Sequence, residues 1–437
     1  MSWELTLTLL LGAVIVLMLL GLPVVFAFLA VNVVGAWLVL GGSAGMELLV
    51  RNALDSVTSY TLVPIPLFIF MGELLFHSGL AMRAIDSIDR LIVRVPGRLA
   101  VVAIVAGTIF SAISGSTVAT TMMLGSLLLP EMLKRGYSPR LAMGAIMGIG
   151  GVDALIPPSA LTVLFASLAV IPVAPLLIGG VVPGLILSAA FVGYIVLASY
   201  FKWEKTPDEA PVRLTPRERW IPLFRDVMPL VLIFVVVVVS MARGWAAPTE
   251  AAGVGATATL AVAALYRSLT RKGFIAALRG TAIATGAILF IIMGASTYSQ
   301  ILNFSGATSG LIVSITSGGG DPLIILIVML VILIFLGFFL DEVSTMLMTL
   351  PFYMPLVQQL GFDKTWFGVL YMMCMQLGLL TPPFGILLFA MRSVAPKEIS
   401  TRDIFRAANP FMLLGLIALI AVFLWPALAT WLPKLLD

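Results

Sequence analysis

The sequence predicts an all-α, polytopic membrane protein that consists of two copies of one structural unit. Hydrophobic residues make up 61% of the 437 residues and charged residues only 11%, which is far outside the range of soluble globular domains. Long apolar runs separated by short polar segments indicate membrane-spanning helices, because about twenty apolar residues cross the bilayer core as a helix. The sequence lacks the ten-residue alternation of an outer-membrane barrel, so helices must satisfy the backbone amides in lipid.

A motif that returns at a constant offset of 225 residues indicates an internal duplication. Residues 114–159 recur in a weaker copy at residues 341–385, and Pro157-Pro158 falls on Pro382-Pro383. The other matched pairs include Val118 and Val343, Thr120 and Thr345, Met123 and Met348, Pro130 and Pro355, and Gly136 and Gly361. We therefore expect a first repeat over residues 1–201, a linker over residues 202–229 and a second repeat over residues 230–437.

The first repeat is expected to contain six membrane spans and two interfacial segments. Residues 5–20 lack a basic leader and a small-residue cleavage site, so we interpret them as a first span and not as a cleaved signal. Residues 46–59 carry charges four residues apart on one face, and residues 83–98 alternate charged with apolar residues, which predicts helices that lie in the interface. The first span is expected to end near residues 21–23 and the second at about residue 40, and the other expected spans cover residues 60–76, 99–113, 161–177 and 182–201.

A polar linker joins the two repeats, and the second repeat is expected to follow the plan of the first. Residues 202–226 hold six basic and five acidic residues with several prolines, which predicts a solvated linker on the cytoplasmic side by the positive-inside rule. The expected spans of the second repeat cover residues 227–241, 249–266, 281–298, 322–340 and 410–432. Residues 267–279 are expected to be interfacial, and residues 303–320 form a stretch rich in small residues.

Short, interrupted helices occur at matching places in the two repeats. Residues 117–133 and 141–149 are apolar but bounded by small and charged residues, and the double prolines interrupt both copies. Segments broken by Gly or Pro at corresponding positions of two repeats are the best sequence indication of a transporter binding site. We therefore place the candidate site at residues 114–159 and 337–385.

Acidic residues in this motif are functional candidates, because a charge in the membrane is costly without a partner. Asp341 follows an uncharged span and has two interpretations. It can cap the following helix, or it can bind a hard cation such as Na⁺ together with unwound carbonyls and the Thr381 hydroxyl. Asp153 has no acidic partner in the second repeat, and both a gating or hydrogen-bonding role and helix-end capping remain open for it.

The repeat predicts a related, less charged cation site in the first half. Ser116 is the repeat partner of Asp341, and Ser114 and the carbonyls near Gly148 and Gly150-Gly151 complete an oxygen-only set. No Lys or Arg occurs in residues 99–133, 141–201 or 280–363. An anionic substrate would therefore depend on helix N-terminal amides, hydroxyl groups and bound cations, which makes cation coupling physically natural.

The sequence argues against an enzyme and against nucleic-acid binding. The lone His77 lacks a metal-binding or nucleophile-activating pattern, the single Cys374 excludes internal disulfides, and no basic soluble domain is present. A two-aspartate intramembrane hydrolase that uses Asp153 and Asp341 is a distant alternative. A channel is a further alternative, but broken hairpins in a duplicated frame favour alternating access.

The chain resembles the large membrane (M) subunit of the tripartite ATP-independent periplasmic (TRAP) transporters over essentially its whole length. The resemblance is carried by PIPLFIFMGELL, IFSAISGSTVATT, LPEMLKRGY, LIPPS, VVPGL, PTEAAGVGA, LDEVSTMLMTLPFYMPLV and GLLTPPFG. It implies two inverted repeats with re-entrant helical hairpins and an elevator mechanism. Asp153 stands where many members of this family carry an apolar or small residue.

The resemblance also implies which residues bind ions and substrate. It places Na⁺, as coupling ion at two or more sites, on Ser114, Ser116, Gly148, Gly151, Gly337, Asp341 and Thr381. It places the substrate between the hairpin tips, and the residues we expect there are Ser114, Thr117, Asp153, Ser159, Thr345 and Thr381.

The expected function is Na⁺-coupled import of a small organic anion, such as a carboxylate, sulfonate or sugar acid, through a bacterial or archaeal inner membrane. The expected partners are a small membrane (Q) subunit, which is not fused to this chain, and a periplasmic substrate-binding protein (P). A self-sufficient Na⁺/dicarboxylate carrier is the alternative within the transport class.

Overall fold

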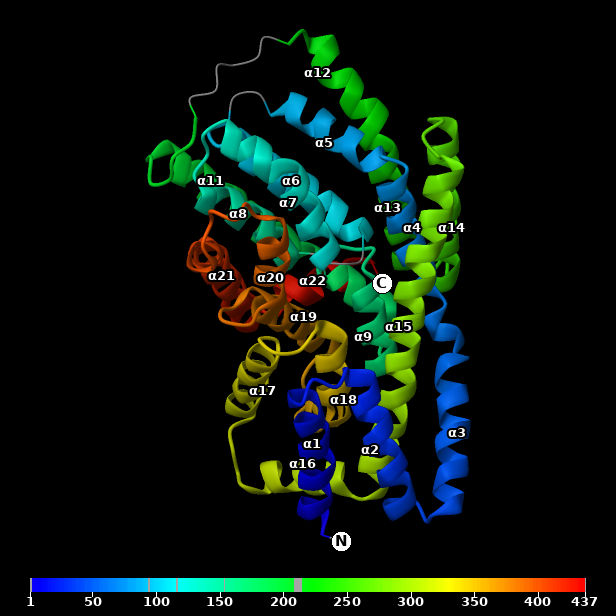
Figure 1. The fold of residues 1–437 in the computed structure, drawn as a ribbon. Coiled ribbons are helices and arrows are strands. Elements are labelled where there is room, and N and C mark those ends of the chain that lie inside the picture. The colour runs from blue at the N-terminus through cyan, green and yellow to red at the C-terminus, as the bar shows by residue number, and fades with distance from the viewer. Residues whose placement is uncertain (1, 93–94, 115–116, 153, 208–213, 437) are drawn as a thin grey trace.

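The computed structural model describes residues 2–92, 95–114, 117–152, 154–207 and 214–436, in which all regular secondary structure is helical (Figure 1). The first part of the chain forms α1 (Trp3–Leu19), α2 (Val24–Val39), α3 (Ser43–Val57), the short 3-10 helix η1 (Tyr60–Leu62), α4 (Pro64–His77), α5 (Leu80–Leu91), α6 (Arg98–Ser114), α7 (Thr117–Lys134), α8 (Pro139–Gly148), η2 (Ile149–Gly151), α9 (Ala160–Ala169), α10 (Val173–Gly179) and α11 (Val181–Tyr200).

The second part of the chain is also helical throughout its described elements. It forms α12 (Pro216–Pro222), η3 (Leu223–Val227), α13 (Met228–Ala242), α14 (Pro248–Leu265), α15 (Arg271–Phe304), α16 (Ala307–Ser317), α17 (Pro322–Leu336), α18 (Glu342–Gln359), α19 (Lys364–Leu380), α20 (Ile386–Val394), α21 (Thr401–Leu424) and α22 (Ala427–Leu436). The prediction of an all-α polytopic membrane protein is confirmed, because five helical stretches of the described residues are long and apolar enough to cross a membrane. These are Tyr60–His77, Val173–Tyr200, Pro216–Ala242, Arg271–Phe304 and Thr401–Leu424.

Helices of the two halves correspond at the offset seen in the sequence. Thr117–Lys134 (α7) shifted by 225 residues coincides with Glu342–Gln359 (α18), and the next helix of each half, α8 and α19, begins at Pro139 and at Lys364. Both proline pairs interrupt helices, since α8–η2 ends before Pro157 and α19 ends before Pro382. Each peptide bond within the two proline pairs is cis. The ends of α8–η2 and α19 ahead of the proline pairs confirm the predicted helix breaks.

Several helix boundaries differ from the prediction, and three of the differences have a clear local reason. The expected linker over residues 202–229 becomes helical at Pro216, because Thr215 and Glu218 form a capping box and proline suits the first helical position. The expected span over residues 161–177 is broken after Ala169, where Val170 adopts a left-handed conformation and Pro172 follows. The expected interfacial segment 267–279 and span 281–298 join in the continuous helix α15, which contains no proline.

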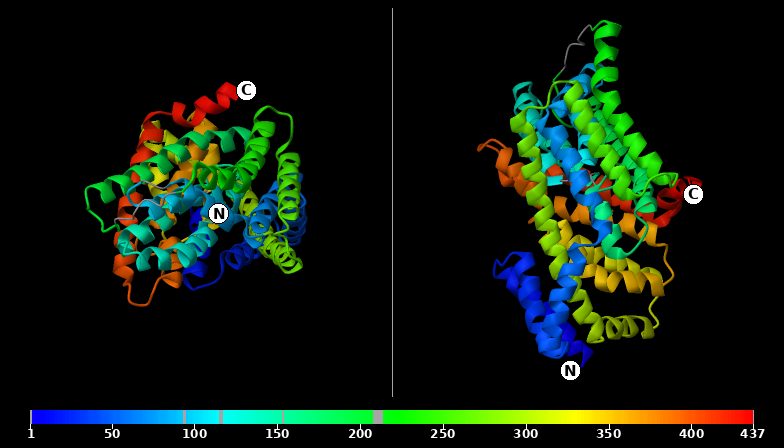
Figure 2. Two further views of the ribbon diagram at one scale, coloured as in Figure 1. Left: turned by 90° about the horizontal axis from the view of Figure 1, so that it is seen from above. Right: turned by 90° about the vertical axis from the view of Figure 1, so that its right-hand side faces the viewer.

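The long helix α15 organises one side of the molecule, where it packs against α2, α3 and α4 (Figure 1). Polar side chains join α3 to α15. Asn52 Nδ2 donates to Ser296 Oγ at 3.1 Å, and Gln300 Nε2 donates to Asn52 Oδ1 at 2.7 Å. These partly buried contacts add hydrogen bonds to the packing of α3 on α15. Figure 2 shows the elongated shape that results, with α1 at one end and α12 at the other.

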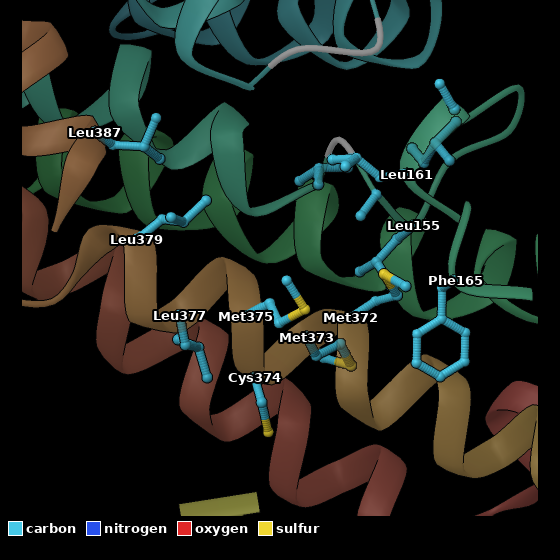
Figure 3. Close-up of a cluster of buried hydrophobic side chains, with 14 of the residues drawn as sticks. Leu155, Leu161, Phe165, Met372, Met373, Cys374, Met375, Leu377, Leu379 and Leu387 are labelled. Atoms are coloured by element: carbon cyan, nitrogen blue, oxygen red, sulfur yellow. The ribbon is translucent and has the colours of Figure 1, made fainter. Parts of the chain in front are cut away.

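Helix α19 lies in the core of the other side, and its residues from Trp366 to Leu380 are all buried. It packs against α17 and α21, while α8 packs against α21 and α7 against α20. The rings of Phe165 and Tyr371 lie 4.8 Å apart and join α9 to α19. Leu155 and Phe165 point toward Met372 and Met373 of α19 (Figure 3). The two broken hairpins thus share one apolar core.

A nearly buried ion pair fastens α5 to the start of α6. Arg98 is 7% exposed, and its Nη2 lies 2.6 Å from Asp89 Oδ2 and 2.9 Å from the Asp89 carbonyl. Asp89→Ala removes the only negative charge that Arg98 contacts among the described residues and leaves it the Asp89 carbonyl, so we expect the free energy of unfolding to fall by about 3 kcal/mol. Thermal unfolding of the detergent-purified protein measures this change. Glu47→Ala, which removes the exposed Arg51–Glu47 pair, is the control and should cost less than about 1 kcal/mol. Equal effects of the two variants would contradict the prediction.

Candidate functional site

The N-termini of α7 and α18 meet at a pair of residues related by the repeat. Thr117 is the first residue of α7, Glu342 is the first residue of α18, and they are 225 residues apart. The Thr117 hydroxyl donates to Glu342 Oε1 at 3.3 Å, and the threonine is 1% exposed. Because a helix N-terminus carries partial positive charge, two positive helix ends converge on this point. The predicted substrate residue Thr117 therefore lies at the contact between the two hairpins.

Gln376 of α19 completes this contact. Its Nε2 donates to the same Glu342 Oε1 at 2.9 Å, and its side chain is 2% exposed. Its Oε1 is buried and accepts no hydrogen bond from the described residues. Gln376 and its repeat partner Gly151 also line a cavity of about 10 Å³, which is room for one group of the size of water. We call Thr117, Glu342 and Gln376 the tip cluster.

Asp341 caps α18, which agrees with one of its two interpretations from the sequence. Its carboxylate accepts hydrogen bonds from the Ser344 backbone N–H at 3.5 Å and from the Ser344 hydroxyl. Its carbonyl accepts a hydrogen bond from Thr345 Oγ1 at 3.0 Å. An ionised carboxylate offers about four lone-pair sites, so capping leaves acceptor capacity for a cation.

Gly337 and Thr381, the other residues of this predicted ion site, end two helices that approach closely. Gly337 follows α17, and a Cβ added there would lie 2.9 Å from Gly378 Cα. Thr381 follows α19, and its hydroxyl donates to the Leu377 carbonyl at 2.6 Å. The close backbone approach brings the ends of α17 and α19 together, with Asp341 four residues beyond Gly337.

The predicted ion site of the first repeat is described in part. Ser116 lies outside the described residues, and of Ser114 the structure describes only the backbone at the end of α6. Gly148 ends α8, and a Cβ there would meet the ring of Phe411 at 2.5 Å. Close packing is thus sufficient to require glycine at position 148. Gly151 has more room, with its nearest neighbours at 3.8 Å or beyond.

The remaining predicted substrate residues use their hydroxyls inside their own helices. Ser159 is buried and caps α9 by accepting a hydrogen bond from the Thr162 N–H at 3.3 Å. Thr345 is buried and donates to the Asp341 carbonyl. Asp153, the remaining substrate candidate and one acid of the hydrolase alternative, lies outside the described residues.

Sequence reasoning singled out Asp341 and missed its neighbour Glu342 and the more distant Gln376. Glu342 had a signal, because it is a second acid in an apolar motif and its repeat partner is the predicted site residue Thr117. Gln376 had a weaker signal as the polar residue of the apolar run 366–380. Among the described residues, no three His, Cys, Asp or Glu side chains form a cluster that could hold a metal ion. The acceptors gathered here are instead carbonyls, hydroxyls and carboxylates.

Comparison with known proteins assigns this arrangement to a family. The family model described as the DctM component of the tripartite ATP-independent periplasmic transporter matches residues 11–428. The C4-dicarboxylate TRAP transporter large permease protein DctM of Pseudomonas aeruginosa is 30% identical over 91% of this chain and 94% of its own length. The sialic acid TRAP transporter large permease protein SiaM of Vibrio cholerae is 28% identical over 92% of each chain.

A solved structure supports the fold. The YdaH transporter of Alcanivorax borkumensis superposes with a TM-score of 0.64 at 13% sequence identity, over 89% of this chain and 90% of that one. The match to the family model extends over nearly the whole chain and includes both broken hairpins. This protein therefore belongs to the DctM family, the large permease component of the tripartite ATP-independent periplasmic transporters, and is a multi-pass protein of the inner membrane.

Proposed function

We propose that this permease imports a small organic acid by Na⁺-coupled secondary active transport, and that a periplasmic binding protein delivers the substrate. The observation that carries the proposal is the meeting of the repeat-related helix N-termini at Thr117 and Glu342. Helix N-termini attract anionic groups. Hydroxyl groups and bound cations beside these two helix ends would hold the carboxylate, sulfonate or sugar-acid end of a substrate.

Two Na⁺ sites beside the hairpin tips would provide the driving force. Asp341 and Thr381 supply a carboxylate and a hydroxyl at the ends of α18 and α19, where unwound carbonyls are also near. Oxygen ligands of these kinds suit a hard cation. In the first repeat, Gly148 and Gly151 would contribute carbonyls, and Ser114 and Ser116 would complete that site. Each bound ion adds positive charge to a region whose segments 99–133, 141–201 and 280–363 lack Lys and Arg.

An elevator motion of the hairpin core against the frame around α15 would carry the substrate across the membrane. The hairpin helices α7, α8, α18 and α19 share one packed core, whereas α2, α3 and α4 are tied to α15. A rigid frame beside a compact core that contains the site is the arrangement that such a movement needs. The relatives in P. aeruginosa and V. cholerae carry C4-dicarboxylates and sialic acid, which supports an organic acid as the cargo and a small membrane subunit and a binding protein as partners.

Uptake into proteoliposomes tests this proposal. The vesicles would contain this permease with its small membrane subunit, under an imposed inward Na⁺ gradient, and the binding protein would be added with radiolabelled organic acids one at a time. The expected result is uptake that requires the Na⁺ gradient and the binding protein together. Uptake without the binding protein would favour the self-sufficient carrier, and uptake unaffected by dissipating the Na⁺ gradient would overturn Na⁺ coupling.

A further inference from the structure

The carboxylate of Glu342 lies at the place between the two hairpin tips where an anionic group would otherwise bind. Glu342 is the first residue of α18, and its Oε1 accepts the Thr117 hydroxyl hydrogen from the first residue of α7. Both helix N-termini therefore already face a negative charge that belongs to the protein. A second anion at the same point would be repelled by this carboxylate and by the adjacent Asp341.

Gln376 of the tip cluster offers a further hydrogen-bond acceptor to a ligand. Its Nε2 is engaged with Glu342 at 2.9 Å, while its Oε1 is buried and accepts no hydrogen bond from the described residues. Buried polar atoms in folded proteins almost always have a partner, so this oxygen is positioned for a hydrogen-bond donor. The tip cluster thus presents a carboxylate and an amide oxygen, which are both acceptors.

The charge of the surrounding segments points to the same kind of ligand. Residues 280–363, which include the whole of α18, contain no Lys or Arg but contain Asp321, Asp341, Glu342 and Asp363. Residues 99–133, which include most of α6 and α7, also contain no Lys or Arg. The negative charges near the tip cluster and its hydrogen-bond acceptors therefore both favour a positively charged donor group there.

We propose that the substrate is an organic acid that also carries a cationic nitrogen, such as an ammonium group, and that Glu342 binds this nitrogen. This inference rests on the proposed function, because it assigns the substrate class of the same site. An ammonium group has three hydrogen-bond donors and no acceptor, which matches the Glu342 carboxylate and the Gln376 oxygen. The acidic end of the substrate then lies farther from Glu342, toward the Na⁺ sites. Glu342 selects zwitterions over simple anions of the same size.

Direct binding to the purified permease with its small membrane subunit tests the proposal without the selectivity of the binding protein. The probes are radiolabelled pairs in which a hydroxyl replaces the ammonium group: 4-aminobutanoate and 4-hydroxybutanoate, taurine and isethionate, and glutamate and 2-hydroxyglutarate. In saturating Na⁺, we expect the amine member of at least one pair to bind at least tenfold more tightly than its partner. Preference for the hydroxyl members, or binding of neither member of any pair, would overturn the assignment.

Variants of Glu342 separate charge recognition from structure. Glu342→Gln keeps the size of the side chain and should lower affinity for the amine member at least tenfold, with affinity for the hydroxyl member unchanged or improved. Glu342→Asp keeps the charge and should restore part of the preference. Glu131→Gln, at the other end of α7 in an exposed pair with Arg135, is the matched control and should leave the preference intact. An equal loss for both members of the pair in Glu342→Gln would contradict a charge-selecting role.

The uptake assay distinguishes failure of this inference from failure of the proposed function. Uptake of hydroxyl acids that needs Na⁺ and the binding protein would preserve the proposed function and overturn the zwitterion assignment. Uptake of amine acids that is independent of Na⁺ would overturn Na⁺ coupling and preserve the assignment of Glu342.

Discussion

Asp341→Asn is expected to reduce Na⁺-driven uptake by at least about 100-fold while α18 remains folded. Asparagine caps a helix about as well as aspartate, so the N-terminus of α18 keeps its geometry. The substitution removes the negative charge that would neutralise Na⁺ at this place, and it therefore separates the two roles that the sequence leaves open for this residue. The measurement is initial uptake rate in proteoliposomes as a function of Na⁺ concentration, with gel filtration of the same preparation as a check on folding.

A matched control for this variant exists in the neighbouring helix. Asp321 caps α17 by accepting a hydrogen bond from the Leu323 N–H at 2.8 Å, and it is exposed. Asp321→Asn should leave both the rate and the Na⁺ dependence of uptake unchanged. If Asp341→Asn also leaves them unchanged, Asp341 acts only as a cap and the second Na⁺ site is assigned wrongly.

Gly378→Ala is expected to destabilise the protein although alanine favours helices. A Cβ at this position would lie 2.6 Å from Gly337 Cα and 3.1 Å from the Ile334 carbonyl oxygen, and neither backbone atom can move without displacing α17 from α19. Overpacking of this kind costs about 1–3 kcal/mol in the free energy of unfolding. Because the displaced helix ends carry Gly337 and Thr381, uptake should fall as well. Thermal unfolding in detergent and the uptake assay measure the two effects.

The control for the glycine variant is a glycine whose replacement by alanine should not lower the stability of the protein. Gly286 lies within α15, and a Cβ there would meet nothing within 4 Å. Gly286→Ala should leave stability unchanged or raise it by up to about 1 kcal/mol, since alanine restricts the unfolded chain more than glycine does. A Gly378→Ala protein as stable as the Gly286→Ala protein would show that α17 and α19 are not in tight contact.

The helices and their breaks could be predicted from the sequence because their causes are local. Apolar runs of span length, the double prolines and the repeated motif each act over a few residues, and the structure has the expected breaks after α8–η2 and α19. The helix start at Pro216 and the break after Ala169, which the sequence analysis did not predict, also have local causes, namely the capping box at Thr215 and the conformation of Val170.

The site was predictable only to the extent that a residue's role depends on its own helix. Asp341 was recognised because an acid that follows an uncharged span has few possible roles besides helix capping and cation binding. Its capping role follows from the helix that it precedes. Glu342 and Gln376 were missed because their role depends on the hydrogen bond between them. They are 34 residues apart and lie on different helices, so the sequence does not show that they meet. For Gly148 and Gly378 the sequence offers no reason for glycine, whereas the packed neighbours Phe411 and Gly337 supply one.

By itself, the sequence determined that this protein is a duplicated helical membrane protein with two broken hairpins, because apolar length, proline and glycine act through the backbone nearby. Only the tertiary structure decided that the first residues of α7 and α18 meet, that Glu342 occupies the point where they converge, and that α17 and α19 touch at two glycines. Contacts between residues 225 positions apart depend on how whole helices pack, and side-chain shape sets that packing across the core.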